Sequence, residues 1–411
     1  MENVARVVVT GIGVVSSAGF SRQAFWEALV TGSSGIRRIE GFDTSCFRHR
    51  YGAEVRDFDV RNFIGRKNVR YLDRITRMGL AAAALSLEDA GIETSALNEK
   101  RSGIVMGTMH SGWGSVAEFE CSMENNRGRR VSPALFPNTV LNSAASQIAI
   151  EFHLRGLCTT LNTGFASGAD AIGYGYEYIR NRRADLVLAG GAEELNKWIY
   201  GSFDLEEPPG DCRNGHCDNC RPFDADRRGF TIGEGACFLV LENLAEAGRR
   251  KAPIYGEIKG YVTNYAGNVH EADSIGDTVA EVIENAVSRA GVDAEDIGFI
   301  CAEGNGTHAS DMAESQAIQT LFRKNSKKPA VSSIKPVIGH TIGASGAFNA
   351  ATCCLAIQGQ AIPPTLNLVT PDPLFPLDHV MNSPRTCKIK NTLCNSFSPG
   401  GNHAALVIGH S

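Results

Sequence analysis

Three side chains able to hold or move a proton stand in short apolar, glycine-rich segments of the second half of the sequence. Glu303 lies in residues 301–314, and Lys335 and His340 lie within residues 331–346. Imidazole is a common general acid or base near neutral pH, and burial could raise the pKa of a carboxyl such as Glu303 toward neutrality. Two simpler roles stay open: a salt bridge between Glu303 and Lys335, and a hydrogen-bonded pair of Lys335 and His340 that holds its segment in shape.

A fourth feature is a sharp turn that contains Phe165. Residues 157–161 form an apolar run, residues 169–180 have a helical pattern, and the turn between them reads Asn-Thr-Gly-Phe-Ala-Ser-Gly. A turn from a strand into a helix presents a side chain at the helix N-terminus, where free N–H groups and the helix dipole favour an anion. Such a position suits a nucleophile, but the ring of Phe165 can only fill space there.

Strands and amphipathic helices alternate along the chain, which predicts a mostly parallel sheet covered by helices, and hence an α/β protein. Glycine-rich turns lead into short apolar strands at 233–241 and 400–408, and earlier strands open each half at 6–10 and 254–263. These pairs predict an internal duplication. The predicted halves are residues 1–250 and 251–411.

The clearest predicted helices cover residues 77–90, 275–290 and 344–358. Directly after the first strand, residues 10–13 read Thr-Gly-Ile-Gly. A dinucleotide-binding loop would need a third glycine, so we expect a tight turn at this point.

The composition excludes several classes of protein. Apolar residues make up 43% of the chain and charged residues 21%, as in ordinary globular proteins, and the net charge of -5 argues against a nucleic-acid binder. The longest uncharged stretch, residues 341–371, contains three prolines, so we expect a buried helix and a loop there and no membrane span. Twelve cysteines without a secretion signal indicate reduced thiols in a cytoplasmic protein.

Four segments together resemble the β-ketoacyl-(acyl carrier protein) synthases of fatty-acid and polyketide synthesis, and the resemblance extends over nearly the whole chain. They are residues 162–168, 301–314, 331–346 and 395–402. The second is similar to the family's Asn-Ala-His-Gly-Thr-x-Thr-x-x-x-Asp-x-x-Glu, and the last to Asn-Ser-Phe-Gly-Phe-Gly-Gly-Thr-Asn. The resemblance implies a thiolase-like fold, internally duplicated, with five layers in the order α-β-α-β-α, and no cofactor.

The resemblance also implies which residues would carry the chemistry. The family uses a cysteine, two histidines, a lysine and two backbone N–H groups. Lys335 and His340 match, but Phe165 stands in place of the cysteine and Glu303 in place of the first histidine. Pro399, which has no N–H, replaces the gatekeeping phenylalanine whose N–H is an oxyanion donor. Losing one such donor costs roughly 2.7–4 kcal/mol in the transition state, so three changes together predict that condensing activity is lost.

The favoured interpretation is therefore a subunit analogous to a chain-length factor, which pairs with an active ketosynthase and sets the length of its product. Acyl carrier protein is a further expected partner; nucleic acid and membranes are not. Two alternatives stay open. One is a homodimeric enzyme that uses Glu303 and His340 as acid and base on an acyl thioester without covalent capture, and the other is a non-catalytic module that binds acyl groups or carrier protein.

Other positions follow from the same resemblance. Leu135 and Phe136 match a loop and helix that cross the family's dimer interface, so we expect them to cap the partner's acyl tunnel. Met109 and Trp113, in a glycine-rich segment, are expected to line the same tunnel.

A basic cluster in residues 63–70 is either a solvated helix face or a docking patch for the acidic acyl carrier protein. Its charged members are Arg66, Lys67 and Arg70.

A cysteine-rich stretch follows residue 206. Cys212, His216, Cys217 and Cys220 offer soft metal ligands, but a structural zinc site usually has a second pair of closely spaced ligands. We therefore expect no metal and a surface loop with free thiols, with a zinc site or a disulfide as the alternatives.

Overall fold

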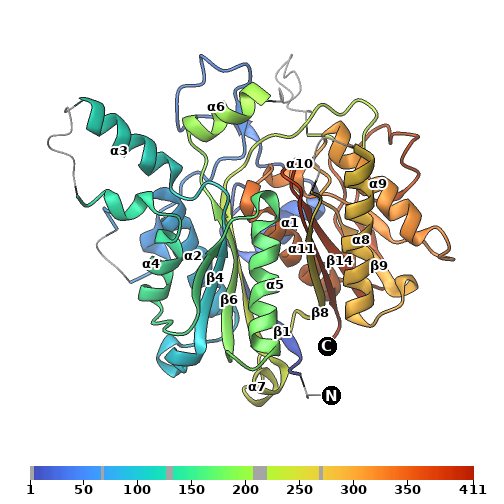
Figure 1. The fold of residues 1–411 in the computed structure, drawn as a ribbon, viewed down its shortest axis with the longest axis horizontal. Helices are drawn as coiled ribbons and strands as arrows, with labels where there is room; N and C mark the ends of the chain where they lie inside the picture. The colour runs from blue at the N-terminus through green and yellow to red at the C-terminus, as the bar shows by residue number, and fades with distance from the viewer. Residues whose placement is uncertain (1–3, 66–68, 126–132, 207–219, 268–271) are drawn as a thin grey trace.

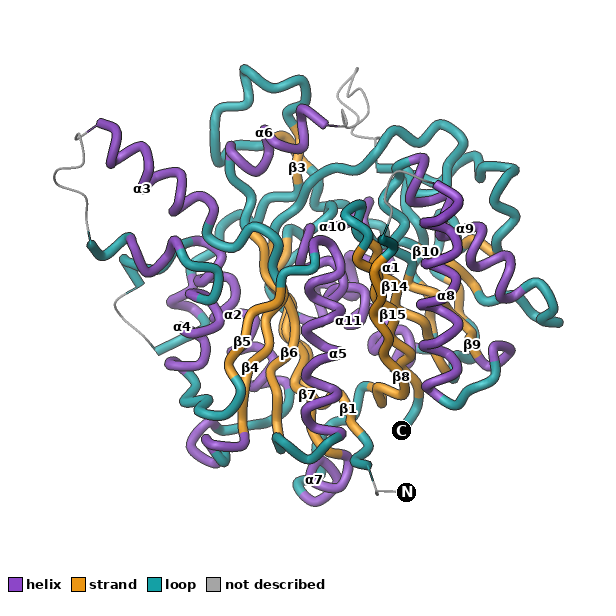
Figure 2. Tube along the Cα trace, in the orientation of Figure 1, coloured by secondary structure: helices purple, strands orange, loops and turns teal. Residues whose placement is uncertain are grey.

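The computed structural model describes residues 4–65, 69–125, 133–206, 220–267 and 272–411. Within these residues one mixed sheet has the strand order β12-β10-β9-β14-β15-β8-β1-β7-β6-β4-β5 (Figures 1 and 2). Its first-half strands are β1 (Val7–Ser16), β4 (Ser102–Gly107), β5 (Cys158–Leu161), β6 (Leu186–Glu193) and β7 (Gly235–Asn243). Its second-half strands are β8 (Gly256–Tyr265), β9 (Ile297–Cys301), β10 (Ala330–Ser332), β12 (Asp378–His379), β14 (Asn391–Phe397) and β15 (Asn402–Gly409).

The two halves repeat one pattern of strands. In the first half β1 and β7 are antiparallel, β7 and β6 are antiparallel, and β6, β4 and β5 run parallel. In the second half β8, β15, β14, β9 and β10 repeat this order and these directions. The halves join where residues 7–9 pair with residues 256–258. This repetition confirms the internal duplication, while the exact boundary at residue 250 stays a prediction.

Helices cover both outer faces of the sheet and also lie between its halves (Figure 1). α2 and α4 pack on the outer face of the first half, and α8 and α9 cover the second. α5 and α11 lie in the centre and contact strands of both halves. The predicted five-layer, thiolase-like α/β fold is therefore confirmed. The expectation of a mostly parallel sheet is wrong, because every pair of neighbouring strands from β14 to β6 is antiparallel. The bounds are α2 (Arg74–Asp89), α4 (Ser143–Glu151), α5 (Ser167–Arg180), α8 (Ala272–Ala290), α9 (His308–Phe322) and α11 (Ser345–Gly359).

Shorter elements connect these layers. The helices among them are α1 (Arg22–Thr31), α3 (Trp113–Asn125), α6 (Lys197–Glu206), α7 (Leu244–Arg249) and α10 (Lys335–Ile338). Two small pairs of strands are β2 (Arg37–Arg38) with β3 (Tyr51–Gly52), and β11 (Ala361–Ile362) with β13 (Arg385–Thr386).

The predicted helices are present, with small differences at their ends. α2 begins at Arg74, earlier than expected, because the carboxylate of Asp73 accepts the N–H of Thr76 at 3.0 Å and caps the helix. α8 and α11 lie close to their predicted bounds.

The expected tight turn at residues 10–13 is wrong. β1 runs straight through this segment, with only a bulge between Val9 and Gly11. A Cβ at Gly13 would overlap the carbonyl oxygen of Ala82 in α2. The glycines therefore let a helix backbone lie directly on the strand, which is a packing requirement that a local reading of the sequence does not show.

Candidate functional site

The predicted strand, turn and helix around Phe165 are present. β5 ends at Leu161, and a 3-10 turn, η5 (Gly164–Ala166), leads directly into α5. Gly164 has a φ of 62°, and a Cβ there would overlap the hydroxyl of Ser398. The turn is thus packed against the connection between β14 and β15, and it holds Phe165 at the N-terminus of α5.

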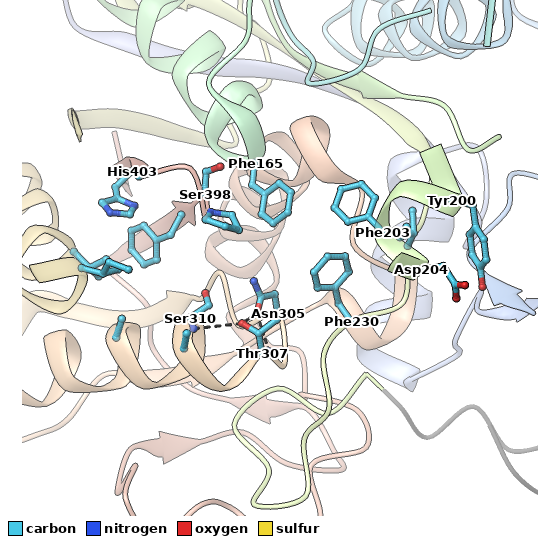
Figure 3. Close-up of a pocket in the computed structure, with 18 residues that line it drawn as sticks. Phe165, Tyr200, Phe203, Asp204, Phe230, Asn305, Thr307, Ser310, Ser398 and His403 are labelled. Atoms are coloured by element: carbon cyan, nitrogen blue, oxygen red, sulfur yellow. Dashed lines mark hydrogen bonds between the residues drawn. The ribbon is translucent and has the colours of Figure 1, made fainter. Parts of the chain in front are cut away.

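The ring of Phe165 is 2% exposed and lies in an aromatic cluster. Its centroid is 6.0 Å from the ring of Phe230, 6.3 Å from that of Phe203 and 4.4 Å from that of His340. Figure 3 shows the three phenyl rings side by side. The position that the sequence indicates for a nucleophile is therefore filled by a hydrocarbon ring.

Glu303 joins the other two predicted site residues into one buried group. Its Oε1 lies 3.0 Å from Nε2 of His340, and its Oε2 lies 3.5 Å from Nζ of Lys335. The three side chains are at most 1% exposed. The predicted salt bridge to Lys335 is present, but Lys335 and His340 are linked through Glu303 and not to each other.

The hydrogen bonds of His340 assign its protons. Nδ1 accepts the backbone N–H of Ile342 at 3.0 Å, so Nε2 carries the hydrogen that is donated to Glu303. The rings of Phe165 and Phe230 lie 4.4 and 4.6 Å from the imidazole. Both nitrogens are therefore engaged within the protein, and aromatic rings cover the imidazole.

Burial and charge act against each other at this group. Burial by itself raises the pKa of Glu303, but the Lys335 ammonium and the hydrogen bond from His340 outweigh it, so the pKa of Glu303 lies below its usual value. Burial lowers the pKa of His340, and Glu303 offsets this only in part. At neutral pH the site therefore holds a carboxylate beside a neutral imidazole.

The loop that carries Glu303 is held from α9. Glu314 accepts the backbone N–H groups of Glu303 and Gly304 at 3.0 and 2.9 Å, and it also accepts the side-chain amide of Asn395 at 2.8 Å. Burial raises the pKa of Glu314 to about 7, although these hydrogen bonds favour its ionised form. Glu303 is thus positioned by buried hydrogen bonds to α9.

Pro399 lies in the turn between β14 and β15, where its side chain is exposed. It has no N–H, and the N–H of the preceding Ser398 is donated to the carbonyl of Asn402 at 2.9 Å. Neither residue therefore presents a free backbone donor toward Phe165.

Met109 is the one predicted tunnel residue that contacts the aromatic cluster around Phe165. Its backbone N–H is donated to Glu193, which also accepts the hydroxyl of Thr108 at 2.9 Å. Burial raises the pKa of Glu193 to about 8.

The other predicted tunnel and interface residues lie apart from this cluster. Trp113 begins α3 and is 50% exposed, and Phe136, in the 3-10 turn η4 (Phe136–Thr139), is 58% exposed and packs on Phe119. Leu135 lines a separate hollow next to Trp198. Trp113 therefore does not line the site of this chain, and the expectation that Leu135 and Phe136 cap the tunnel of a partner stays a prediction.

The predicted docking patch and the predicted metal ligands lie partly outside the described residues. Arg66 and Lys67 lie outside them, and Arg70 is placed over the ring of Tyr71, 5.7 Å from its centroid.

Of the four possible metal ligands, Cys212, His216 and Cys217 lie outside the described residues. Cys220 is fully buried, and burial raises the pKa of its thiol to about 12. Over the described ranges, no three His, Cys, Asp or Glu side chains gather in a way that could hold a metal ion. In the same part of the chain, no helix combines the length and apolarity needed to cross a membrane.

Sequence reasoning missed Phe203 and Phe230, which complete the aromatic cluster, and His403, which is buried in β15. His403 had a usable signal, because it is a polar residue in an apolar strand. The two phenylalanines had none, since their contact with Phe165 depends on segments far apart in the chain.

Comparisons with known proteins agree with this architecture. Residues 4–247 match the family model described as beta-ketoacyl synthase, N-terminal domain, and residues 255–369 match the one described as beta-ketoacyl synthase, C-terminal domain. A 3-oxoacyl-[acyl-carrier-protein] synthase 2 from Coxiella burnetii (strain RSA 493 / Nine Mile phase I) is 34% identical over 406 residues, which cover 98% of each chain.

Two solved structures are also similar over the full length. The ishigamide ketosynthase/chain length factor is 33% identical with a TM-score of 0.91, and the match covers 99% of this chain and 100% of that chain. A type II polyketide synthase acyl-carrier protein in complex with its ketosynthase bound to the hexaketide is 28% identical with a TM-score of 0.89, over 100% of both chains. The chain belongs to the β-ketoacyl synthase family of fatty-acid and polyketide synthesis.

Proposed function

We propose that this chain is a ketosynthase-like subunit without condensing activity of its own, and that it acts as a chain-length-factor-type partner of an active β-ketoacyl synthase. The observation that carries the proposal is the buried ring of Phe165 at the start of α5, 4.4 Å from the ring of His340. Covalent capture of an acyl group at this helix N-terminus needs a sulfur or oxygen nucleophile, and a phenyl ring has neither.

The groups around Phe165 support the same function. Nε2 of His340 is bound to Glu303 at 3.0 Å and so is not free to act on a substrate. Pro399 cannot donate a backbone hydrogen bond to a thioester oxyanion. A site that lacks the nucleophile, a free imidazole and one oxyanion donor suits a structural role and not the catalysis of condensation.

A surface beside α3 suits a protein partner. Two large apolar side chains are exposed there: Trp113 at the start of α3, and Phe136, which packs on Phe119 of α3. An exposed apolar surface of this kind is typical of an interface. One similar structure is the ishigamide ketosynthase/chain length factor, which supports a second ketosynthase-type chain as the partner. Acyl carrier protein is a further proposed partner, since another similar structure is a ketosynthase in complex with its acyl-carrier protein.

A homodimeric enzyme that uses Glu303 and His340 as acid and base is the second candidate. It would need an acyl pocket that reaches Glu303. Among the described residues, the cavity of about 400 Å³ next to Phe165 is lined by neither Glu303 nor His340. The geometry therefore favours the non-catalytic function.

The test is purification of the tagged chain from its native host, followed by native mass spectrometry. The proposal expects a 1:1 complex with a second ketosynthase-type chain that has a cysteine at the start of the helix equivalent to α5. That complex should condense acyl and malonyl groups on carrier protein, and removal of this chain should abolish the activity or change product length. A stable homodimer with no such partner would contradict the proposal.

The variant Phe165→Cys tests whether the missing cysteine is the only reason that the site would not catalyse condensation. We expect the purified variant to remain inactive in condensation, because Glu303 still occupies His340 and Pro399 still lacks an N–H. Transfer of a radiolabelled acyl group to the new thiol and release of the condensed product are measured separately. Full condensation by this single variant would show that Glu303 and Pro399 do not block the chemistry.

A further inference from the structure

Helix α3 is held to the rest of the molecule by few buried contacts. Over Trp113–Asn125 the one buried residue is Ser115, and the helix packs mainly on η4 and α6. In Figure 1 α3 extends away from the sheet at the edge of the molecule. A helix with so little buried surface gains little packing energy to fix its position. Its position therefore depends on residues 108–112, which join it to β4.

Two adjacent carboxyl groups hold this connection at both of its ends. Glu193, the last residue of β6, accepts the hydroxyl of Thr108 at 2.9 Å and the backbone N–H groups of the next two residues. Glu194 accepts the backbone N–H of Gly114, in the first turn of α3, at 2.8 Å. Glu193 is 1% exposed and Glu194 is 5% exposed. The connection and the start of α3 are therefore tied to the sheet through this pair of carboxyl groups.

Uncharged groups face Glu193 from the elements packed on it. Nδ1 of His110 lies 3.8 Å from Oε2 of Glu193, and this nitrogen is buried without a hydrogen-bond partner. Burial lowers the pKa of His110 to about 4, so the ring is neutral. β7 meets Glu193 with the backbone of Gly235, and the 3-10 turn η7 (Ile342–Ala344) meets it with the backbone of Gly343. After a small shift a protonated Glu193 donates to Nδ1 of His110, whereas an ionised Glu193 meets no counter-charge at these contacts.

The charges that face Glu194 are mostly of its own sign. Asp73, the N-cap of α2, and Glu234 both raise the pKa of Glu194. Arg74 also faces Glu194, but its guanidinium binds both carboxylate oxygens of Glu234. If Glu193 and Glu194 both ionise, two negative charges therefore stand together without a cation of their own.

Burial sets the protonation of the pair. It raises the pKa of Glu193 to about 8 and that of Glu194 to about 7, although the hydrogen bonds that they accept favour the ionised forms. In water each carboxyl returns to its ordinary pKa of 4.5. The closed segment thus keeps protons that the open segment releases. Its stability is therefore fully present below pH ~4.5 and falls until the pH reaches the folded-state values.

We propose that Glu193 and Glu194 form a pH-sensitive latch for α3. The protonated pair holds residues 108–114 on β6, and ionisation of the pair releases them, because the carboxylates are hydrated when the segment lifts away. β6 itself lies between β7 and β4 inside the sheet, so the segment is the part that moves. The proposal rests on contacts within this chain and does not depend on its partner or activity.

Hydrogen exchange with mass spectrometry on the full-length protein tests the latch from about pH 5.5 to 8.5. The measured quantity is the protection factor of the amides in residues 109–114, which corrects for the intrinsic dependence of exchange on pH. We expect it to fall about tenfold per pH unit for each proton that opening releases. The amides of α5 should not show this fall. A protection factor of residues 109–114 that does not depend on pH, or an equal fall in α5, would overturn the latch.

The variants Glu193→Gln and Glu194→Gln test the two carboxyl groups. Glutamine keeps an oxygen that accepts the N–H groups of the segment but has no proton to release, so each variant should reduce the fall by about tenfold per pH unit. The double variant should show no dependence on pH. Glu314→Gln is the matched control, because Glu314 is also buried, has a pKa raised to about 7 and accepts backbone N–H groups, but it holds the loop of Glu303. This control should leave the fall at residues 109–114 unchanged.

The pH profile of the unmodified protein decides the proposal by itself if a variant does not fold. A folded double variant that keeps the pH dependence of the unmodified protein would show that another group controls the segment, and it would overturn the assignment of Glu193 and Glu194.

Discussion

The carboxylate of Glu303 supplies the counter-charge of Lys335 and the hydrogen-bond acceptor of His340. Without its carboxylate, the Lys335 ammonium would be a buried charge with no counter-charge at 3.5 Å, and Nε2 of His340 would lose its acceptor at 3.0 Å. A buried charge that loses its partner is strongly destabilising. The same contacts that stabilise this group also engage both nitrogens of the imidazole within the protein.

The first prediction concerns Glu303→Gln. The glutamine still accepts a hydrogen bond from His340 but leaves the buried Lys335 without a counter-charge, so the free energy of unfolding should fall by about 3–5 kcal/mol at pH 7.5. Urea unfolding measures this. The double variant Glu303→Gln/Lys335→Met removes both charges and should recover most of the loss. A double variant as unstable as the single one would show that Lys335 is not the cause.

The same variant has a defined dependence on pH. The folded-state pKa of Glu303 lies below its ordinary value of 4.5. The stability that its charge contributes is therefore fully present above pH ~4.5 and is lost as the pH falls through the folded-state pKa. The difference in unfolding free energy between the unmodified protein and Glu303→Gln should shrink over that range, and a difference that grows on acidification would contradict the assignment.

Close contact between a strand and a helix organises the outer face of the first half. β1 passes beneath α2, and the glycines of β1 allow backbone-to-backbone approach. A Cβ at Gly11 would overlap the carbonyl oxygen of Ser86, as one at Gly13 would overlap that of Ala82. The distance between the two elements is thus set by the absence of two side chains.

The second prediction concerns Gly13→Ala. The added methyl group has no space against the α2 backbone, so the free energy of unfolding should fall by about 1–3 kcal/mol, as in other overpacked cores. Gly248→Ala is the control, because Gly248 lies exposed in α7 with nothing within 4 Å of its added Cβ. The control should gain up to about 1 kcal/mol from helix propensity. Equal stability of the two variants, measured by urea unfolding, would contradict the packing argument.

The central layer makes the two halves of the molecule depend on each other. α5 belongs to the first half and α11 to the second, yet both contact strands of both halves. The helices approach closely at their N-termini, where a Cβ on Gly346 would lie 2.5 Å from the backbone nitrogen of Ala169. One continuous hydrophobic core includes residues from both halves. Neither half can bury its inner face alone.

The third prediction is that residues 1–250, expressed alone, do not fold. Without α11, the first half would expose buried apolar side chains such as Phe25 and Cys237, which contact Phe348 and Ala347 of α11. Near-ultraviolet circular dichroism and urea unfolding should show no fixed tertiary packing and no cooperative transition. In the full-length protein, hydrogen exchange should give the amides of α5 and α11 the same free energy of opening. A cooperatively folding first half would contradict this view.

Local sequence determined the elements and many of the side chains at the site. Apolar periodicity and glycine placement predicted the strand, turn and helix around Phe165, the helices α2, α8 and α11, and the duplicated architecture. These signals are local, because hydrogen bonding within a helix and alternation along a strand depend on neighbouring residues. Comparison of motifs also brought Glu303, Lys335 and His340 into one predicted site.

The tertiary structure decided how those residues are paired and what surrounds them. Glu303 and His340 are 37 residues apart in the chain. Their hydrogen bond forms because the fold brings the end of β9 next to the segment that precedes α11. The same holds for Phe230 against Phe165, for His403 in the cavity wall, and for the glycines of β1 beneath α2. Contacts of this kind depend on the order of strands and the depth of burial, and no stretch of neighbouring residues encodes either of these.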